Sequence, residues 1–348
     1  MKRNQNTFRG CLVGGAIGDA LGWPVEFLKL REIINRYGPD GIKDLKITSS
    51  GKAEITDDTQ MTLFTAEGII RGQARGIEKG IFHPPSVVFY AYQRWLLTQG
   101  YPRIKEYEWA YDGWLLGINE LHARRAPGNS CLSALLSRKK GSIDDPINNS
   151  KGCGGIMRIA PTGLFYKKDK AFDMAVDFAA LTHGHPSGYL SAGALAYLIA
   201  TIIEGVDIDV ALENTLRKLK GYKSHEECSH ILKKAIELTN SGLSDTEAIQ
   251  KLGEGWIGEE ALAISVYCAL KYHDNFKKAL IVSVNHDGDS DSTGAITGNI
   301  LGAYLGLSQI PETWIEKVEL KEVLLQVADD LNVEYNEDNL DWNRYPGY

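Results

Sequence analysis

Hydrophobic positions along most of this chain recur at the spacing of an amphipathic helix. Val87, Tyr90 and Ala91, for example, follow intervals of three and four residues, and stretches rich in alanine and leucine run through residues 179–202. Alternation of apolar and polar residues over five or more positions, which would predict half-buried strands, is hard to find. The pattern therefore predicts an all-α fold.

Three of the predicted helices carry a stripe of small residues at four-residue intervals. A glycine inside a helix costs roughly 1 kcal/mol relative to alanine. The stripes therefore need a compensating gain, which close approach of two helix backbones would supply. We expect tightly packed central helices that begin near Phe8, Gly188 and Thr293. The stripes are Gly10, Gly14, Gly18, Gly22; Gly188, Ala192, Ala196, Ala200; and Gly294, Gly298, Gly302, Gly306.

The length of 348 residues allows one large domain or two smaller ones. The loop-like stretches, at 48–51, 126–130, 142–155 and 253–258, lack the length and composition of an interdomain linker. We therefore expect a single compact domain of many packed helices over residues 1–348.

Charge and cysteine content argue against several classes of function. The net charge is −7 and the basic residues are scattered, unlike the basic footprint of a nucleic-acid binder. The five cysteines are far apart and include no C-x-x-C pair, which argues against a disulfide framework or a zinc site. The N-terminus lacks a signal-peptide apolar core, and the most apolar run, 190–203, is shorter than the ~20 residues that span a bilayer. We expect a cytoplasmic protein with no membrane partner.

A first acidic cluster, Thr56-Asp57-Asp58-Thr59-Gln60, opens a predicted helix. Asp57 with Gln60 three positions later forms a capping-box pattern, and acidic residues suit the positive end of the helix dipole. Capping alone does not require two adjacent carboxylates, whose charges repel unless a cation neutralises them. Two interpretations of this cluster therefore remain: a helix cap, or one half of a metal site.

A second cluster places Asp287, Asp289 and Asp291 at alternate positions, with hydroxyl side chains between them. In an extended loop these carboxylates would project the same way, a geometry that wraps cations. The segment is not an EF-hand loop, because no glutamate follows at the required distance. Such oxygen donors suit Mg²⁺, Mn²⁺ or Ca²⁺ and suit Zn²⁺ poorly. If the fold brings the two clusters together, they would form a metal site that neither forms alone.

A glycine-rich segment, Gly152-Cys153-Gly154-Gly155-Ile156-Met157-Arg158, can expose backbone N–H groups to an anion such as a pyrophosphate, although a simple tight turn explains it equally well. It matches neither the Walker spacing nor the dinucleotide fingerprint. His183 and His185 lie at a predicted helix junction, where ligand contact or capping is favoured over metal coordination. Glu26 lies just past the first glycine helix, and its position alone predicts only a surface residue.

Taken in order, these motifs resemble the ADP-ribosylglycohydrolase family, which includes dinitrogenase-reductase-activating glycohydrolase and the ADP-ribosylarginine hydrolases. The resemblance runs from Phe8 to the Gly302-Ala303 region, nearly the whole chain. It rests on the ordered set Gly-Asp-Ala-x-Gly, Thr-Asp-Asp-Thr, Pro-Gly-Asn-Ser, Gly-Gly-x-Met-Arg, Thr-His-x-His and Asp-x-Asp-Ser.

The resemblance implies an all-α domain with two divalent cations, Mg²⁺ or Mn²⁺, at the base of a cleft. It also implies an ADP-ribosylated protein as substrate and ADP-ribose as product. Carried over by position, the metal ligands would be Thr56, Asp57, Asp58, Asp289, Asp291 and Ser292. The residues contacting ADP-ribose would be Gly152, Cys153, Gly154, Gly155, Met157, Arg158 and His183.

The chemistry that this implies is cleavage at the anomeric carbon of ADP-ribose through an oxocarbenium-like state. Glu26 matches an acid that lies near the metals in relatives. Glu26, or a metal-ligating aspartate such as Asp58 or Asp291, would serve as the general base. The sequence departs from the family pattern at Ser292, where many relatives have threonine. It departs again at Arg125-Ala126-Pro127, where some relatives carry a catalytic acid whose role cannot be transferred.

The resemblance favours ADP-ribosylarginine as the substrate, because arginine-type relatives dominate bacterial sequences of this appearance. Glu259 and Glu260, expected near the cleft mouth, would attract a guanidinium leaving group. Trp256 would stack on adenine or on the leaving group, or lie in the core. One alternative is the same chemistry on ADP-ribosylserine, a free ADP-ribose derivative or a nucleic-acid adduct. Another is a non-catalytic relative that binds ADP-ribose or is purely structural.

Overall fold

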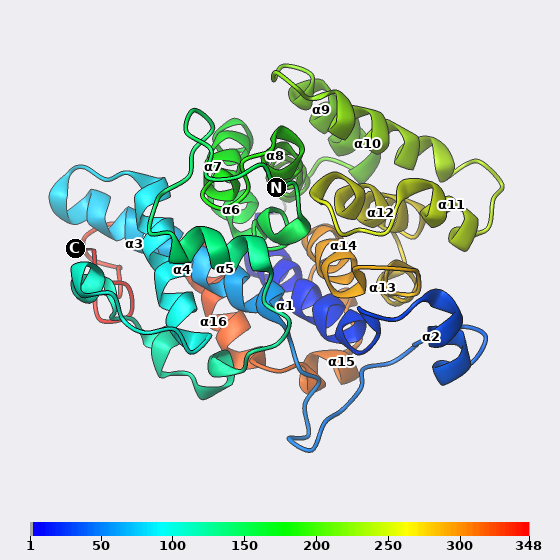
Figure 1. The fold of residues 1–348 in the computed structure, drawn as a ribbon, viewed down its shortest axis with the longest axis horizontal. Coiled ribbons are helices and arrows are strands. Elements are labelled where there is room, and N and C mark those ends of the chain that lie inside the picture. Colours follow the sequence, from blue (N-terminus) through cyan, green and yellow to red (C-terminus); the bar gives the residue numbers. More distant parts are fainter. Residues whose placement is uncertain (1–2, 348) are drawn as a thin grey trace.

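Two helices from opposite ends of the chain pack against each other at the centre of the molecule. In the computed structural model, which describes residues 3–347, α1 (Gln5–Gly22) lies beside α14 (Ser290–Leu305) (Figure 1). A Cβ atom built on Gly14 would lie only 2.5 Å from the carbonyl oxygen of Gly298, so no larger residue fits there without a shift. The predicted use of the glycine stripes for close backbone packing is confirmed.

The two glycine helices run antiparallel. Gly10 faces Gly302, whereas Gly22, at the other end of α1, faces Ser290 at the start of α14. The C-terminal end of α1 and the N-terminal end of α14 therefore meet. The chain that leaves α1 continues through a short 3₁₀ helix, η1 (Trp23–Val25), directly to Glu26. Antiparallel packing thus brings Glu26 and the second acidic cluster to the same end of the central pair.

The remaining helices surround this pair (Figure 1). A hydrophobic core of buried residues extends from Phe8 to Tyr345. The part of the chain that the structure describes contains no β-strand, only isolated bridges, so the all-α prediction is confirmed. The other helices are α2 (Leu30–Tyr37), α3 (Asp57–Lys79), α4 (Pro84–Thr98), α5 (Asn129–Leu136), α6 (Ala160–Phe165), α7 (Lys168–Ala180), α8 (Pro186–Ile203), α9 (Ile208–Leu219), α10 (Glu226–Leu238), α11 (Asp245–Leu252), α12 (Gly258–Lys271), α13 (Phe276–Val284), α15 (Glu312–Lys317) and α16 (Lys321–Leu331), with 3₁₀ turns η2 (Lys105–Ala110), η3 (Trp114–Gly117), η4 (Asn119–His122), η5 (Cys153–Gly155) and η6 (Leu307–Gln309).

The predicted starts of the central helices are each a few residues late. Asn4 caps α1 by accepting a hydrogen bond from the Thr7 N–H at 3.2 Å, so the helix already begins at Gln5. Asp289 similarly caps α14, which begins at Ser290. Such boundaries depend on cap geometry, which hydrophobic spacing does not report.

Helix α8 contains the most apolar segment of the chain. By length and composition its 18 residues could cross a membrane, but 89% of them are buried inside the protein. His185 caps this helix by accepting the Ser187 N–H at 3.1 Å, so capping, one of the two expected roles, is observed. Burial among other helices explains the apolar character of α8, since a helix that is hydrophobic all round is either a core helix or a membrane span.

Candidate active site

The two acidic clusters lie on the walls of one cleft. Its volume is about 470 Å³, and its walls come from segments far apart in the sequence. They are the turn after η1, the N-termini of α3 and α14, the loop before α5, η5 and the loop before α12. The residues lining it are Glu26, Phe27, Asp57, Asp58, Arg124, Ala126, Pro127, Gly128, Asn129, Leu132, Cys153, Gly154, Met157, Trp256, Asp289, Asp291 and Ser292.

The first cluster forms the N-terminus of α3, but not as the capping box that the sequence predicts. Thr56 is the N-cap, and its hydroxyl accepts the Asp58 N–H at 3.3 Å. Asp57 is instead the first helical residue, and its Oδ2 accepts the Gly128 N–H at 3.2 Å. Gln60 turns away and donates to the Ala123 carbonyl oxygen at 2.8 Å. Both carboxylates of the cluster are therefore left facing the cleft.

Asp19, a residue of the Gly-Asp-Ala motif that sequence reasoning did not place in the site, holds this N-terminus in position. Its carboxylate accepts the Thr56 N–H at 3.0 Å and the Thr59 N–H at 3.1 Å, and it also accepts the Thr59 hydroxyl. Burial raises the pKa of Asp19 to about 6 despite these hydrogen bonds. The sequence signal that could have revealed this role is a carboxylate inside a glycine stripe. Such a residue lies in a closely packed helix, and a buried acid requires hydrogen-bond partners.

The second cluster is not an extended row of three carboxylates. Asp289 is the N-cap of α14 and accepts the Ser292 N–H at 3.2 Å, while Asp291 lies within the first helical turn. Asp287 instead accepts the Leu30 N–H at 2.6 Å, at the start of α2, and does not line the cleft. The expectation that Asp287 projects with the other two was wrong, because a helix begins between them.

Five carboxylates line the cleft and, among residues 3–347, are opposed there by a single guanidinium, that of Arg124. Burial, followed by the charges of Asp289 and Asp57, raises the pKa of Glu26 to about 9. Burial likewise raises the pKa of Asp57 to about 8, and it raises the pKa values of Asp58 and Asp291 well above their usual range. Glu26 is only 6% exposed, so it is not the surface residue that its position in the sequence alone indicates. The cleft as it stands has a deficit of positive charge.

The donor atoms of the cleft fit a hard divalent cation. Glu26 Oε2 and Asp58 Oδ2 are buried oxygen atoms with no hydrogen-bond partner in the described part of the chain, and the neighbouring donors are carboxylates and hydroxyls. Within residues 3–347, however, no three His, Cys, Asp or Glu side chains already converge around a point that a metal ion could occupy. Rotation of the side chains alone would bring these carboxylates inward, so the unpartnered oxygens and the charge deficit still fit a bound cation.

The glycine-rich segment contributes part of the cleft wall beside the second acidic cluster. Its backbone is fixed to the loop before α12, because the Cys153 N–H donates to the Trp256 carbonyl oxygen at 3.1 Å. The Cys153 thiol donates to Asp289 Oδ2 at 2.7 Å. Of the residues that we expected to contact ADP-ribose, the structure places Cys153, Gly154 and Met157 at the cleft surface. It does not place Gly152, Gly155, Arg158 or His183 there, and among the expected metal ligands Thr56 also lies behind the wall.

Arg158 and His183 support the glycine-rich segment from behind. Arg158 is fully buried, donates to the Thr182 hydroxyl at 2.7 Å and lies over the Tyr92 ring. The same hydroxyl bonds His183 Nδ1 at 2.8 Å, and burial lowers the pKa of His183 to about 3, so the imidazole is neutral. A Cβ built on Gly154 would lie 3.1 Å from His183 Cε1, which shows how closely the ring underlies the segment.

Glu259 and Glu260 do not lie where we expected them. Glu259 is buried and its Oε1 pairs with Lys151 Nζ at 2.6 Å. Glu260 accepts the backbone N–H groups of Glu254 and Gly255 at 3.0 and 3.2 Å. Neither lines the cleft, so the prediction that they attract the leaving group is wrong. Both belong to the first turn of α12, where carboxylates stabilise the helix terminus.

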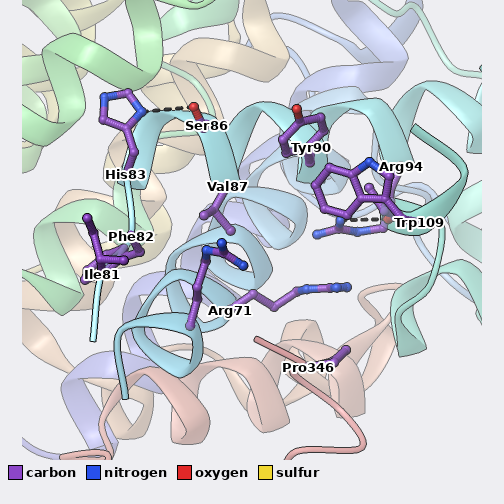
Figure 2. Close-up of a pocket in the computed structure, with 12 residues that line it drawn as sticks. Arg71, Ile81, Phe82, His83, Ser86, Val87, Tyr90, Arg94, Trp109 and Pro346 are labelled. Atoms are coloured by element: carbon purple, nitrogen blue, oxygen red, sulfur yellow. Dashed lines mark hydrogen bonds between the residues drawn. The ribbon is translucent and has the colours of Figure 1, made fainter. Parts of the chain in front are cut away.

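A larger cavity of about 760 Å³ lies elsewhere, between α3, α4 and η2 (Figure 2). Its buried arginines are matched by carboxylates, since Arg71 pairs with Asp112 and Arg94 with Glu67, each at 2.8 Å. Among the described residues, no carboxylate lines this cavity. We therefore place the chemistry in the smaller cleft, where the charged groups are unbalanced and two oxygens lack partners.

Comparison with known proteins places the chain in a family. Residues 1–340 match the model of the family described as ADP-ribosylglycohydrolase. The chain is 25% identical to ADP-ribosylhydrolase ARH3 of Mus musculus, over 96% of this chain and 93% of that protein. It is also 25% identical to the ADP-ribosylarginine hydrolase Tri1 of Serratia proteamaculans, over 93% of this chain and 78% of that protein. A solved structure described as an ADP-ribosylglycohydrolase-related protein complex shares the fold, with a TM-score of 0.68, 23% identity and coverage of 95% of this chain and 99% of that one.

Proposed function

Because the chain belongs to the ADP-ribosylglycohydrolase family, we propose that it hydrolyses the bond between ADP-ribose and an arginine side chain of a modified protein. The observation that carries the proposal is the convergence of five carboxylates from three segments on one cleft, two of them with an unpartnered buried oxygen. The likeness to a relative named as an ADP-ribosylarginine hydrolase supports the choice of arginine.

Two divalent cations, Mg²⁺ or Mn²⁺, would be held by oxygen atoms of both clusters. The proposed ligands at the cleft surface are Asp57, Asp58, Asp289, Asp291 and Ser292. Thr56, the N-cap of α3 directly before Asp57, would join them only if its hydroxyl turned toward the cleft. When bound, such cations orient ribose hydroxyls and lower the pKa of a coordinated water. They would also balance the charge deficit of the cleft. The raised pKa of Glu26 has the charges of Asp289 and Asp57 among its causes, so balancing these charges would favour its ionised form.

The remaining steps follow from residues of the chain. The Cys153–Met157 wall, fixed by the backbone bond to Trp256, would position the ADP-ribose part of the substrate. Glu26 Oε2, or the neighbouring Asp58 or Asp291, would accept the proton of the attacking water. The bond between the anomeric carbon and the guanidine nitrogen then breaks through an oxocarbenium-like state. The carboxylate then returns the proton of the water to the departing guanidine nitrogen, and the hydroxyl group of the water stays on the anomeric carbon of ADP-ribose.

The test is release of free ADP-ribose from arginine-linked and serine-linked ADP-ribosyl peptides, with Mg²⁺, with Mn²⁺ and after EDTA treatment. We expect metal-dependent release from the arginine-linked peptide. Asp291→Asn should lower kcat/KM about 100-fold. Asp287→Asn is the matched control, because this aspartate belongs to the same segment but lies outside the cleft. Release only from the serine-linked peptide would overturn the choice of arginine. ADP-ribose binding without release from either would indicate a non-catalytic relative.

A further inference from the structure

Two exposed aromatic rings lie together at the cleft and have no role in the mechanism above. Phe27 is 67% exposed and Trp256 is 39% exposed, and both line the cleft beside the carboxylates. Their ring centroids are 6.0 Å apart and the planes differ by 20°, so the rings are stacked. Single exposed apolar residues are common on protein surfaces. A stacked pair on the wall of an acidic cleft is instead suited to contact a ligand.

The ring pair connects two segments of the cleft wall, and polar contacts hold its indole ring. Phe27 directly follows Glu26, in the turn after η1, whereas Trp256 precedes α12. Trp256 Nε1 donates to Glu254 Oε2 at 3.1 Å, and Glu254 Oε1 pairs with Lys29 Nζ at 2.9 Å. These contacts hold the indole while leaving much of its surface open to solvent. The indole would therefore lose little side-chain entropy when a ligand binds.

The aromatic faces of the rings favour a cation. The proposed divalent cations would balance the cleft carboxylates, and the guanidinium of Arg124 donates to the Gln99 carbonyl oxygen and lies over the Tyr101 ring. The attraction for a further cation would therefore come from the two rings themselves. A planar guanidinium binds to the face of tryptophan or phenylalanine through cation–π attraction and stacking. A serine hydroxyl has neither the charge nor the planar face, so it gains nothing from the same rings.

We propose that Phe27 and Trp256 form the subsite for the guanidinium of the target arginine, and that they select arginine-linked over serine-linked ADP-ribose. This inference rests on the proposed function. The position of Phe27 supports it, because the residue is adjacent in sequence to Glu26, the proposed general base, and lines the same cleft. The competing role for the rings is stacking on the adenine of ADP-ribose, which predicts a different result.

The experiment uses Phe27→Leu and Trp256→Leu, which keep an apolar side chain and remove the aromatic face. Trp109→Leu is the matched control, since Trp109 is 52% exposed and lies on the larger cavity, away from the cleft. Each variant is assayed with arginine-linked and serine-linked peptides, and its affinity for ADP-ribose is measured by calorimetry. We expect each cleft variant to lose about ten-fold in kcat/KM on the arginine-linked peptide. Turnover of the serine-linked peptide and the Kd of ADP-ribose should stay within about two-fold of wild type.

Equal losses on both peptides, or weaker ADP-ribose binding, would overturn the subsite and assign the rings to the ADP-ribose part. If the leucine variants kept the wild-type preference for the arginine-linked over the serine-linked peptide, the proposed subsite would be overturned as well. Failure of the wild-type protein to cleave the arginine-linked peptide would instead overturn the proposed function. In that case agmatine binding to the ADP-ribose-saturated protein still decides the subsite, because agmatine carries the guanidinium without the reactive bond. Agmatine affinity that both leucine variants lower about ten-fold supports it, and affinity that neither variant changes refutes it.

Discussion

Replacing Gly14 by alanine tests whether direct backbone contact between α1 and α14 organises the fold. The added Cβ would lie 2.5 Å from the Gly298 carbonyl oxygen, whereas an ordinary contact begins near 3.4 Å. The obstacle is backbone, which cannot turn aside as a side chain can. The helices must therefore separate by roughly 0.9 Å, and a gap of this size forfeits about a quarter to a half of the attraction between facing atoms.

The expected loss in the free energy of unfolding is about 3–5 kcal/mol, above the usual range of about 1–3 kcal/mol for overpacking, because both helices shift along their length. With an unfolding entropy of about 2.1 cal/mol/K per residue, a chain of 348 residues loses roughly 1.4 °C of Tm per kcal/mol. Gly14→Ala should therefore melt about 4–7 °C below the wild type. The measurement is thermal unfolding followed by far-ultraviolet circular dichroism.

Gly72→Ala is the matched control for this substitution. Gly72 also lies inside a helix, α3, but its Cβ would meet the nearest atom, Phe82 Cδ2, at an ordinary 3.4 Å. Without a clash, alanine improves the helix by up to about 1 kcal/mol, so this variant should melt about 1 °C above the wild type. If Gly14→Ala melted at or above the wild-type temperature, as Gly72→Ala should, close backbone packing would not be what the glycine stripes provide.

Three further predictions concern the cleft. Mg²⁺ at 100 times its Kd should stabilise the protein by about 2.7 kcal/mol per site, which raises Tm by roughly 4 °C, and EDTA should reverse this rise in Tm. The Asp291→Asn variant should show no such rise. An equal rise in Tm in this variant would refute the ligand assignment. In EDTA, stability to urea should fall between pH 5 and pH 8, because burial raises the pKa of Asp57 to about 8 and of Glu26 to about 9. The native state then holds protons that the unfolded state has released from about pH 4 upward, and stability that instead rises with pH would contradict this. Asp19→Ala should lower the free energy of unfolding by about 3 kcal/mol, because it leaves the Thr56 and Thr59 N–H groups without their acceptor. It should also weaken Mn²⁺ binding measured by titration calorimetry. Unchanged Mn²⁺ affinity would show that Asp19 does not support the metal site.

The sequence was sufficient to predict the helices and the location of the two acidic clusters at helix N-termini, because both depend on local patterns. Helical periodicity, the glycine stripes and the N-terminal location of each cluster are visible within a few residues of chain. The direction of individual side chains was not predictable in the same way. Whether Asp287 faces the cleft depends on its bond to the N–H of Leu30, a residue 257 positions away in the sequence.

Long-range partners also explain the residues that sequence reasoning placed incorrectly. The sequence predicts Glu259 near the cleft mouth, but Lys151 neutralises it at 2.6 Å and allows its burial. Asp19 is one member of a glycine motif in the sequence, yet it fixes the start of α3 from another helix. In each case the partner lies at least 37 residues away, so no local window contains both groups.

The packing of the glycine helices and the composition of the cleft are physically connected. Because α1 and α14 are antiparallel and in backbone contact, the end of α1 lies at the start of α14, and Glu26 follows directly after η1. Asp19, in the last turn of α1, accepts the backbone N–H groups at the start of α3. One rigid helix therefore sets the relative positions of all three carboxylate-bearing segments, those of Glu26, Asp57 and Asp289. A substitution such as Gly14→Ala, which contacts none of these residues, should consequently weaken Mn²⁺ binding as well as stability.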